Sequence, residues 1–199
     1  MGWGKLQTAL DIIYPPRCVA CGGHVESDYG LCGTCWRQVH FMRGTGCWTC
    51  GLSLPGYLDA SEQAICDSCL SLGPPWRRGV AALAYDETGR SLVLALKHGD
   101  RHDIVRPAAD WMAQVSRVLV QPNMLVAPVP LHWTRLFRRR YNQAALLSAA
   151  LAKRLDLSHC ADLLIRSSRT QSLEGCSTDQ RFAIVGSAMT RNPRYQHRW

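Results

Sequence analysis

This sequence of 199 residues lacks a long apolar run, an export signal and a high content of charged residues. Its longest apolar stretches, residues 92–96 and 124–131, are far shorter than the roughly 18 to 20 residues of a membrane-spanning helix, which excludes an integral membrane protein. The N-terminus has one lysine and neither a long apolar segment nor a small-residue cleavage site, so we expect a cytoplasmic protein. Because 47% of the residues are hydrophobic and 19% are charged, the chain can bury a core, and disorder is excluded.

Acidic residues are scarce in the second part of the chain. Residues 76–199 contain nineteen Lys or Arg and nine Asp or Glu, whereas residues 1–75 contain four and six. The second part therefore carries a formal charge of +10 and the first part −2, which together give the net charge of +8. Two zinc ions, each bound by four thiolates, would lower the net charge to about +4, which weakens the case for nucleic-acid binding from charge alone.

Cysteine is abundant and regularly spaced. Eight of the ten cysteines form four Cys-x-x-Cys pairs before residue 70, namely Cys18 and Cys21, Cys32 and Cys35, Cys47 and Cys50, and Cys66 and Cys69. Ten residues separate the first two pairs and fifteen the last two, so a short hairpin can bring one pair to face another around a tetrahedral ion. We predict two zinc ribbons with structural Zn²⁺; an iron–sulfur cluster and a disulfide framework are the alternatives.

The four cysteine pairs can combine in series or interleaved. Serial pairing is favoured because each site then closes its own short loop, and interleaved pairing stays open. Trp36, Trp48 and Leu52 are predicted to form the small apolar centres of the ribbons. Apolar residues at helical spacing within residues 6–13 predict an N-terminal helix that ends at the prolines that follow.

The pattern changes after a Gly-Pro-Pro sequence at residues 73–75, which predicts domains at residues 1–73 and 76–199. In the second part we predict strands at residues 80–85, 124–130 and 163–166, helices at residues 104–120 and 142–155, and either a helix or a strand at residues 90–96. An apolar strand, a helix and a further strand in succession indicate an α/β fold with a parallel sheet. Residues 85–89 are predicted to form a hairpin turn.

Four arginines follow the predicted central strand, at positions Arg135, Arg138, Arg139 and Arg140, and no acidic residue occurs from residue 131 to residue 155. Ligands of open parallel sheets bind beyond the carboxyl ends of the strands. Guanidinium groups in front of a helix N-terminus are suited to phosphate or pyrophosphate. A solvated basic face and a patch for the nucleic-acid backbone are the alternatives.

Taken in order, these motifs resemble the ComF/GntX family of bacterial proteins. The resemblance rests on the repeated cysteine pairs, Leu96-Lys97, the Pro-Val-Pro strand end at residues 128–130, the Arg-Arg-Arg-Tyr-Asn-Gln run at residues 138–143, Arg169-Thr170 and Arg181-Phe182. It implies a double zinc ribbon joined to a type I phosphoribosyltransferase-like domain and a role in competence and DNA uptake. It also implies that Lys97, Asn142 and Gln143 join the four arginines in binding phosphoribosyl pyrophosphate, with Mg²⁺ in an active enzyme. Single-stranded DNA or helicase machinery are the implied partners.

The sequence departs from the family in its last part. The family's phosphoribosyl-pyrophosphate loop, two acidic residues and a short spacer before Thr-Thr-Gly or Thr-Ser-Gly, does not occur. Leu173, Cys176 and Ile184 also depart from the residues that the family tends to have in its closing loop, expected here at residues 166–181. We therefore expect an incomplete, truncated phosphoribosyltransferase-like domain with impaired catalysis. The alternative function is a zinc-ribbon module that binds nucleic acid or protein without catalysis.

Overall fold

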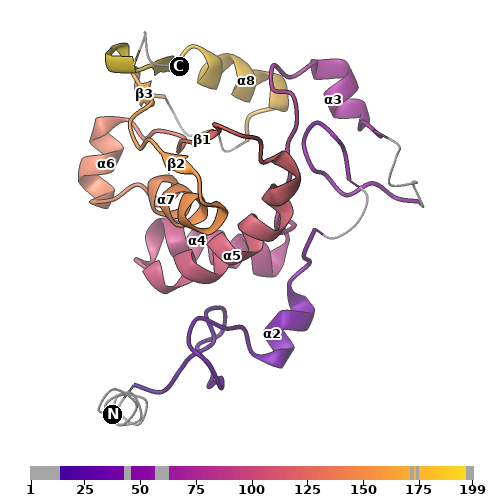
Figure 1. Cartoon of the computed structure of the whole chain (residues 1–199), viewed down its shortest axis with the longest axis vertical. Helices are drawn as coiled ribbons and strands as arrows, with labels where there is room; N and C mark the ends of the chain where they lie inside the picture. Colours follow the sequence, from indigo (N-terminus) through magenta and orange to yellow (C-terminus); the bar gives the residue numbers. More distant parts are fainter. Residues whose placement is uncertain (1–13, 43–45, 57–62, 171–172, 174, 196–199) are drawn as a thin grey trace.

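The structure is a computed structural model that describes residues 14–42, 46–56, 63–170, 173 and 175–195 (Figure 1). The helix predicted within residues 6–13 lies outside the described residues. Two short helices, α2 (Gly33–Gln38) and α3 (Asp67–Leu72), belong to the cysteine-rich part. None of the helices in the described ranges is long and apolar enough to cross a membrane.

The cysteine-rich part repeats one local arrangement twice. Isolated antiparallel bridges join Arg17 to His24 and Gly46 to Ser53, so each first cysteine pair lies at a tight hairpin. The second pair of each unit begins a helix, because Cys32 is the N-cap of α2 and Cys66 that of α3. The internal sequence repeat is therefore also a repeat of backbone structure.

The segment after the ribbons differs from the sequence prediction. Instead of a strand at residues 80–85, the structure has an irregular segment with a single bridge between Phe41 and Leu83. The predicted hairpin turn at residues 85–89 is wrong, because these residues begin helix α4 (Glu87–His98). The carboxylate of Asp86 accepts a hydrogen bond from the amide of Gly89 at 3.1 Å and so caps the helix. A turn-forming sequence and a helix start share the same residue types here.

The structure confirms the two long helices that the apolar periodicity predicts. The predicted helix at residues 104–120 consists of the 3₁₀ turns η1 (His102–Ile104) and η2 (Arg117–Leu119) on either side of α5 (Val105–Ser116). The predicted helix at residues 142–155 is α7 (Gln143–Leu155), which packs against α5. The short helices α6 (Trp133–Arg139) and α8 (Thr178–Gly186) complete the second part, with the 3₁₀ turn η3 (Pro193–Tyr195).

The strands confirm an α/β arrangement but form two small sheets. β1 (Leu125–Val126) pairs in parallel with β2 (Ser158–His159), and the connection between them contains α6 and α7. β3 (Leu164–Arg166) pairs antiparallel with β4 (Met189–Arg191). The strand predicted at residues 124–130 is thus only two residues long, since Pro128 and Pro130 lack the amide hydrogen that a longer ladder would need. The strand predicted at residues 163–166 is confirmed, but it lies outside the parallel pair.

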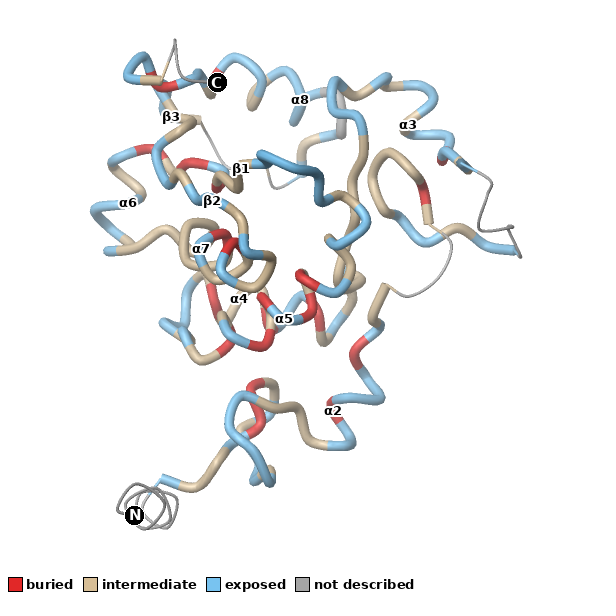
Figure 2. Tube along the Cα trace, viewed as in Figure 1, coloured by how far each residue is buried: buried red, intermediate tan, exposed pale blue. Residues whose placement is uncertain are grey.

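The buried core joins the first ribbon to the helices. Val19 and Val39 of the ribbon form one cluster with Leu92, Ile104 and Trp111 of the helical part. Figure 2 shows buried residues both in the first ribbon and along α5. The domain boundary at residues 73–76 stays a prediction. The buried cluster contains residues from both sides of that boundary.

Two of the three residues that were predicted to form the apolar centres of the ribbons lie on the surface. Trp36 is 45% exposed and Leu52 is 54% exposed. A ribbon of about 30 residues has too little volume to enclose a large side chain, so the buried positions are taken by valine and by the cysteines themselves.

Candidate zinc centres and arginine cluster

The eight paired cysteines gather into two groups of four. In each group the sulfur atoms all lie within 4.8 Å of one another. The groups combine the pairs in series: Cys18, Cys21, Cys32 and Cys35 in the first, and Cys47, Cys50, Cys66 and Cys69 in the second. All eight are free thiols rather than disulfides. The structure thus has the serial arrangement that short loop closure favours.

The spacing of the sulfur atoms fits a tetrahedral ion. The sulfurs of Cys21 and Cys32 are 3.8 Å apart, as are those of Cys50 and Cys66. Zinc–sulfur bonds of about 2.3 Å in a tetrahedron give sulfur–sulfur edges of about 3.8 Å. In both groups the first cysteine also accepts a backbone hydrogen bond at 3.3 Å, from Cys32 to Cys18 and from Cys66 to Cys47. Amide hydrogens aimed at the sulfurs stabilise thiolates, so the donor set fits Zn²⁺.

The thiols of each group have opposite pKa shifts. Burial raises the pKa of Cys18 and of Cys47, but backbone hydrogen bonds outweigh it and lower both pKa values to about 6. Burial, followed by hydrogen bonds to the neighbouring cysteines, raises the pKa of Cys35 and of Cys69 far above the ordinary value. Four crowded thiols cannot all ionise without a cation among them. A bound zinc ion would supply that charge.

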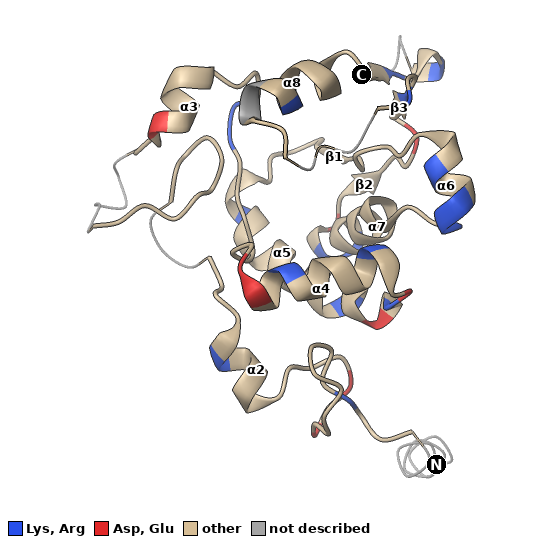
Figure 3. Ribbon diagram, turned by 180° about the vertical axis from the view of Figure 1, so that it is seen from behind, with Lys and Arg blue, Asp and Glu red and all other residues tan. Residues whose placement is uncertain are grey.

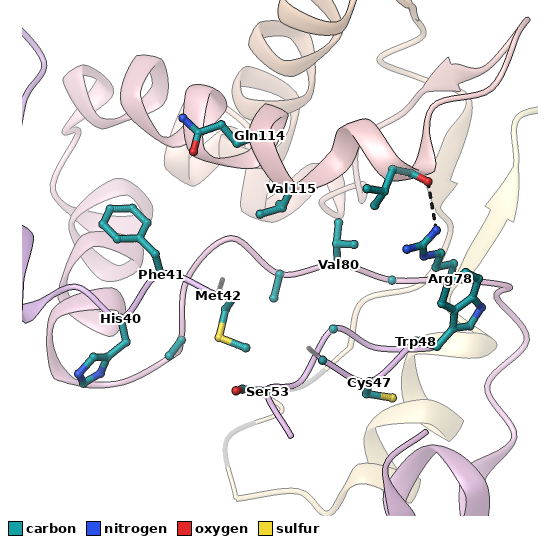
Figure 4. Close-up of a pocket in the computed structure, with 16 residues that line it drawn as sticks. His40, Phe41, Met42, Cys47, Trp48, Ser53, Arg78, Val80, Gln114 and Val115 are labelled. Carbon is teal, nitrogen blue, oxygen red and sulfur yellow. Dashed lines mark hydrogen bonds between the residues drawn. The ribbon is translucent and has the colours of Figure 1, made fainter. Parts of the chain in front are cut away.

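A cavity of about 650 Å³ lies between the second ribbon, residues 78–84 and α5 (Figure 4). Its cationic side chain, Arg78, stacks 3.7 Å from the centre of the Trp48 ring and donates to the carbonyl of Val118 at 3.1 Å. At the other end of the cavity lies His40, whose ring pairs with the carboxylate of Asp86. The Arg78 contacts join the second ribbon to the end of the α5 segment, and the His40 pair joins the residues after α2 to the start of α4, so the cavity marks a structural junction.

The predicted arginines divide between two faces of α6, a helix at one edge of the molecule (Figures 1 and 3). Residues four apart lie on the same side of a helix. Arg135 and Arg139 share one side and are half-buried, whereas Arg138 and the C-cap Arg140 are exposed. Within the described residues, Nε of Arg139 and Oε1 of Gln143 are buried and have no hydrogen-bond partner.

The inward side of α6 meets a residue that sequence reasoning did not assign to the ligand site. Arg135 donates to the carbonyl of Thr170 at 2.8 Å, and Arg166 donates to the Thr170 hydroxyl at 2.5 Å. Burial, and then the nearby charge of Arg135, lower the pKa of Arg166. Within the described residues Nε of Arg166 is buried without a partner, and no carboxylate forms an ion pair with this side chain. In the sequence, Arg166 stood at the end of a predicted strand and at the start of the expected closing loop, but neither position by itself marked it as a phosphate ligand.

Asn142 lies in the turn between α6 and α7, and Lys97 lies in α4, next to the residue that this turn contacts through Tyr141. Asn142 is the N-cap of α7, accepts from the amide of Ala144 at 3.0 Å and donates to the carbonyl of Val129 at 3.2 Å. Lys97 lies in the last turn of α4, where the hydroxyl of Tyr141 donates to the carbonyl of Leu96 at 2.8 Å. The structure therefore gives Asn142 a structural task besides the predicted ligand role, which remains a prediction for both residues.

Replacing Asn142 by alanine is expected to lower the free energy of unfolding by about 1 kcal/mol, because the start of α7 loses its cap and the segment after β1 loses its hydrogen bond at Val129. Urea unfolding followed by circular dichroism measures the loss. Asn142→Asp is the matched control, since aspartate keeps the capping oxygen and should recover most of the stability. Equal losses in both variants would contradict a capping role.

Comparisons with known proteins agree with this geometry. The model of the double zinc ribbon domain matches residues 9–70. Competence protein F of Haemophilus influenzae is 30% identical over 171 residues, which cover 83% of this chain and 72% of that protein. The chain belongs to the ComF family. Two tetracysteine sites in a double zinc ribbon support structural zinc in this ComF chain.

Other relatives match a shorter part of the ComF chain. The DNA utilization protein YhgH of Salmonella typhimurium is 35% identical over 132 residues, which cover 63% of this chain and 55% of that protein. Its namesake from Escherichia coli K12 is 30% identical over 138 residues, which cover 66% and 56%. The chain thus spans little more than half the length of these two relatives. No solved structure matches it.

Proposed function

We propose that this ComF-family chain acts in the cytoplasm in competence and DNA uptake and binds phosphate groups on the inward side of α6. The names of its relatives, competence protein F and DNA utilization protein, support the cellular role. The ligand would be phosphoribosyl pyrophosphate, brought with Mg²⁺, or another compound with adjacent phosphates. The eight paired cysteines would hold two zinc ions, which supply folding energy rather than chemistry because four thiolates leave no open position.

One observation carries the phosphate proposal: Arg135 and Arg166 both donate to Thr170, which brings two guanidinium groups together without a described carboxylate on Arg166. Like charges in a half-buried place repel each other, and an anion between them would remove that cost. Planar guanidinium groups offer paired donors that match phosphate oxygens. Arg139, one turn after Arg135 on α6, and Gln143, the first residue of α7, also have buried polar atoms without partners among the described residues.

We expect binding without transfer for this chain. In a phosphoribosyl transfer the protein mainly positions the sugar and neutralises the leaving pyrophosphate. The arginines are suited to the second of these tasks. The acidic pair that would hold the ribose is not found in the 199 residues, and residues 85–89 form the start of α4. The finer assignment to a phosphoribosyltransferase-like fold belongs to this proposal.

Single-stranded DNA is the second candidate ligand, since polyanions present the same phosphates to arginine. Base stacking on the ribbon tryptophans finds less support. Arg78 covers one face of the Trp48 ring, and Trp36 packs on Phe41 with ring centres 4.6 Å apart. The second candidate therefore depends on phosphate contacts alone and should weaken steeply with salt.

Titration calorimetry of inorganic pyrophosphate, and of phosphoribosyl pyrophosphate with Mg²⁺, into the zinc-loaded chain tests the proposal. Arg166→Gln is expected to weaken binding by roughly tenfold or more, because hydrogen bonds to charged groups are the strong ones. Arg166→Lys should recover only part of the affinity, since an ammonium lacks the planar fork.

Arg117→Gln is the matched control, because it removes the same charge from an exposed position in η2. It should bind both ligands like the parent chain. Absence of binding, or equal affinity in the Arg166→Gln chain, would overturn the phosphate site. Detectable transfer to an acceptor would show that catalysis does not need the acidic pair.

A further inference from the structure

The outward side of α6 presents large apolar side chains to solvent. Phe137 is 87% exposed, Trp133 is 71% exposed and Leu136 is 42% exposed. Positions 133, 136 and 137 are three and four residues apart, so their side chains gather on one side of the helix. We call these three residues the outer face of α6. Phe137 and Trp133 are among the most exposed large apolar residues in the described part of the chain.

Two exposed arginines lie beside this outer face, at the C-terminal end of α6. Arg138 and Arg140 are both exposed, and no acidic residue occurs in the sequence from residue 131 to residue 155. The inward arginine, Arg135, is held by Thr170 and so belongs to the opposite side of the helix. An aromatic and aliphatic surface with an arginine margin needs a partner that is apolar in its interior and anionic at its edge.

We propose that the outer face of α6 binds the surface of a membrane rich in anionic phospholipid, with Trp133 and Phe137 inserted among the acyl chains near the headgroups. Aromatic side chains favour the boundary between headgroups and hydrocarbon, and arginines at the same height meet the lipid phosphates. α6 lies at the edge of the fold, so no other described element stands in front of it (Figures 1 and 3). This surface is separate from the phosphate site on the inward side.

Two other occupants fit these residues less well. Nucleic acid uses aromatic rings for stacking, but Leu136 has no planar face to offer a base. A second copy docked through the same face would bring a second pair of these arginines to the interface, and like charges at an interface oppose association. An anionic membrane satisfies both the apolar centre and the charged margin.

Flotation of the zinc-loaded full chain with vesicles tests the proposal. Vesicles of three parts phosphatidylcholine to one part phosphatidylglycerol should carry the chain upward, and vesicles of phosphatidylcholine alone should carry much less. Phe137→Ser is expected to weaken the partition of the chain into the vesicles by roughly tenfold, because the variant lacks the aromatic ring that would enter the bilayer. Arg138→Gln with Arg140→Gln should remove the preference for anionic lipid.

Tyr85→Ser is the matched control, since Tyr85 is 63% exposed and precedes α4 rather than belonging to α6. It should float like the parent chain. Trp133→Phe should keep the binding but lose the blue shift of tryptophan fluorescence on vesicle addition, which locates the inserted side chain. Zinc content and circular dichroism confirm that each variant is folded.

Three results would overturn the proposal. The first is a parent chain that does not float with anionic vesicles. The second is unchanged flotation of the Phe137→Ser chain. The third is a parent chain that binds a 20-mer of deoxythymidine, or self-associates, through Phe137 while ignoring vesicles; this result would assign the outer face to nucleic acid or to a second copy.

Discussion

Cys18→Ser is expected to remove one of two zinc ions per chain and to destabilise much more than the first ribbon. Structural zinc sites supply on the order of 10 kcal/mol of folding free energy. Val19, next to Cys18, is 2% exposed and shares a cluster with Leu92, Ile104 and Trp111. Arg101 also donates to the carbonyl of Val19 at 3.0 Å. Loss of the first site should therefore loosen the helical part as well.

Cys47→Ser provides the comparison, because the second ribbon contributes no residue to this buried cluster in the described chain. It should also lose one zinc ion, but with a smaller fall in the melting temperature of the helices. Cys160→Ser, outside both groups, should keep two zinc ions. Zinc counting by colorimetric release, together with melting followed at 222 nm, measures these effects. Equal melting of the Cys18 and Cys47 variants would contradict the shared core.

Trp111→Ala is expected to cost about 3 to 5 kcal/mol of unfolding free energy while both zinc ions remain bound. Trp111 is 8% exposed, and its ring meets the edge of Phe41 at 5.5 Å between centres. Phe41 in turn packs on Trp36 of the first ribbon. Removing the indole would leave a cavity between α5 and the ribbon, so the ribbon should detach from the helices before it loses its metal.

Urea unfolding measures this cost, and limited proteolysis of the zinc-loaded chain reports the detachment. In a chain of this length a loss of this size lowers the melting temperature by roughly 6 to 20 °C. Val118→Ala is the control, because Val118 is 58% exposed and its truncation leaves no cavity. A Trp111→Ala chain as stable as this control would show that the ribbon and helices do not share a core.

The sequence alone determined the cysteine chemistry, the α/β class and the long helices. The spacing of the four Cys-x-x-Cys pairs was sufficient to predict metal binding, because only a few loop lengths allow two pairs to surround a tetrahedral ion. Helices α5 and α7 have apolar residues at helical period over twelve residues or more, which leaves no other regular structure. Shorter signals failed: residues 85–89 start a helix rather than a turn, because Asp and Gly serve both.

Only the tertiary structure decided which side chains meet. The run of arginines after β1 looked like one site in the sequence, but the helical turn sends Arg135 and Arg139 inward and leaves Arg138 and Arg140 in solvent. Arg166 joins Arg135 through Thr170 although the two arginines are 31 positions apart in the sequence. Likewise, the contact of Val19 and Val39 with α4 and α5 depends on long-range packing. Spacing along the chain encodes local geometry, whereas contacts between distant residues depend on how the elements pack.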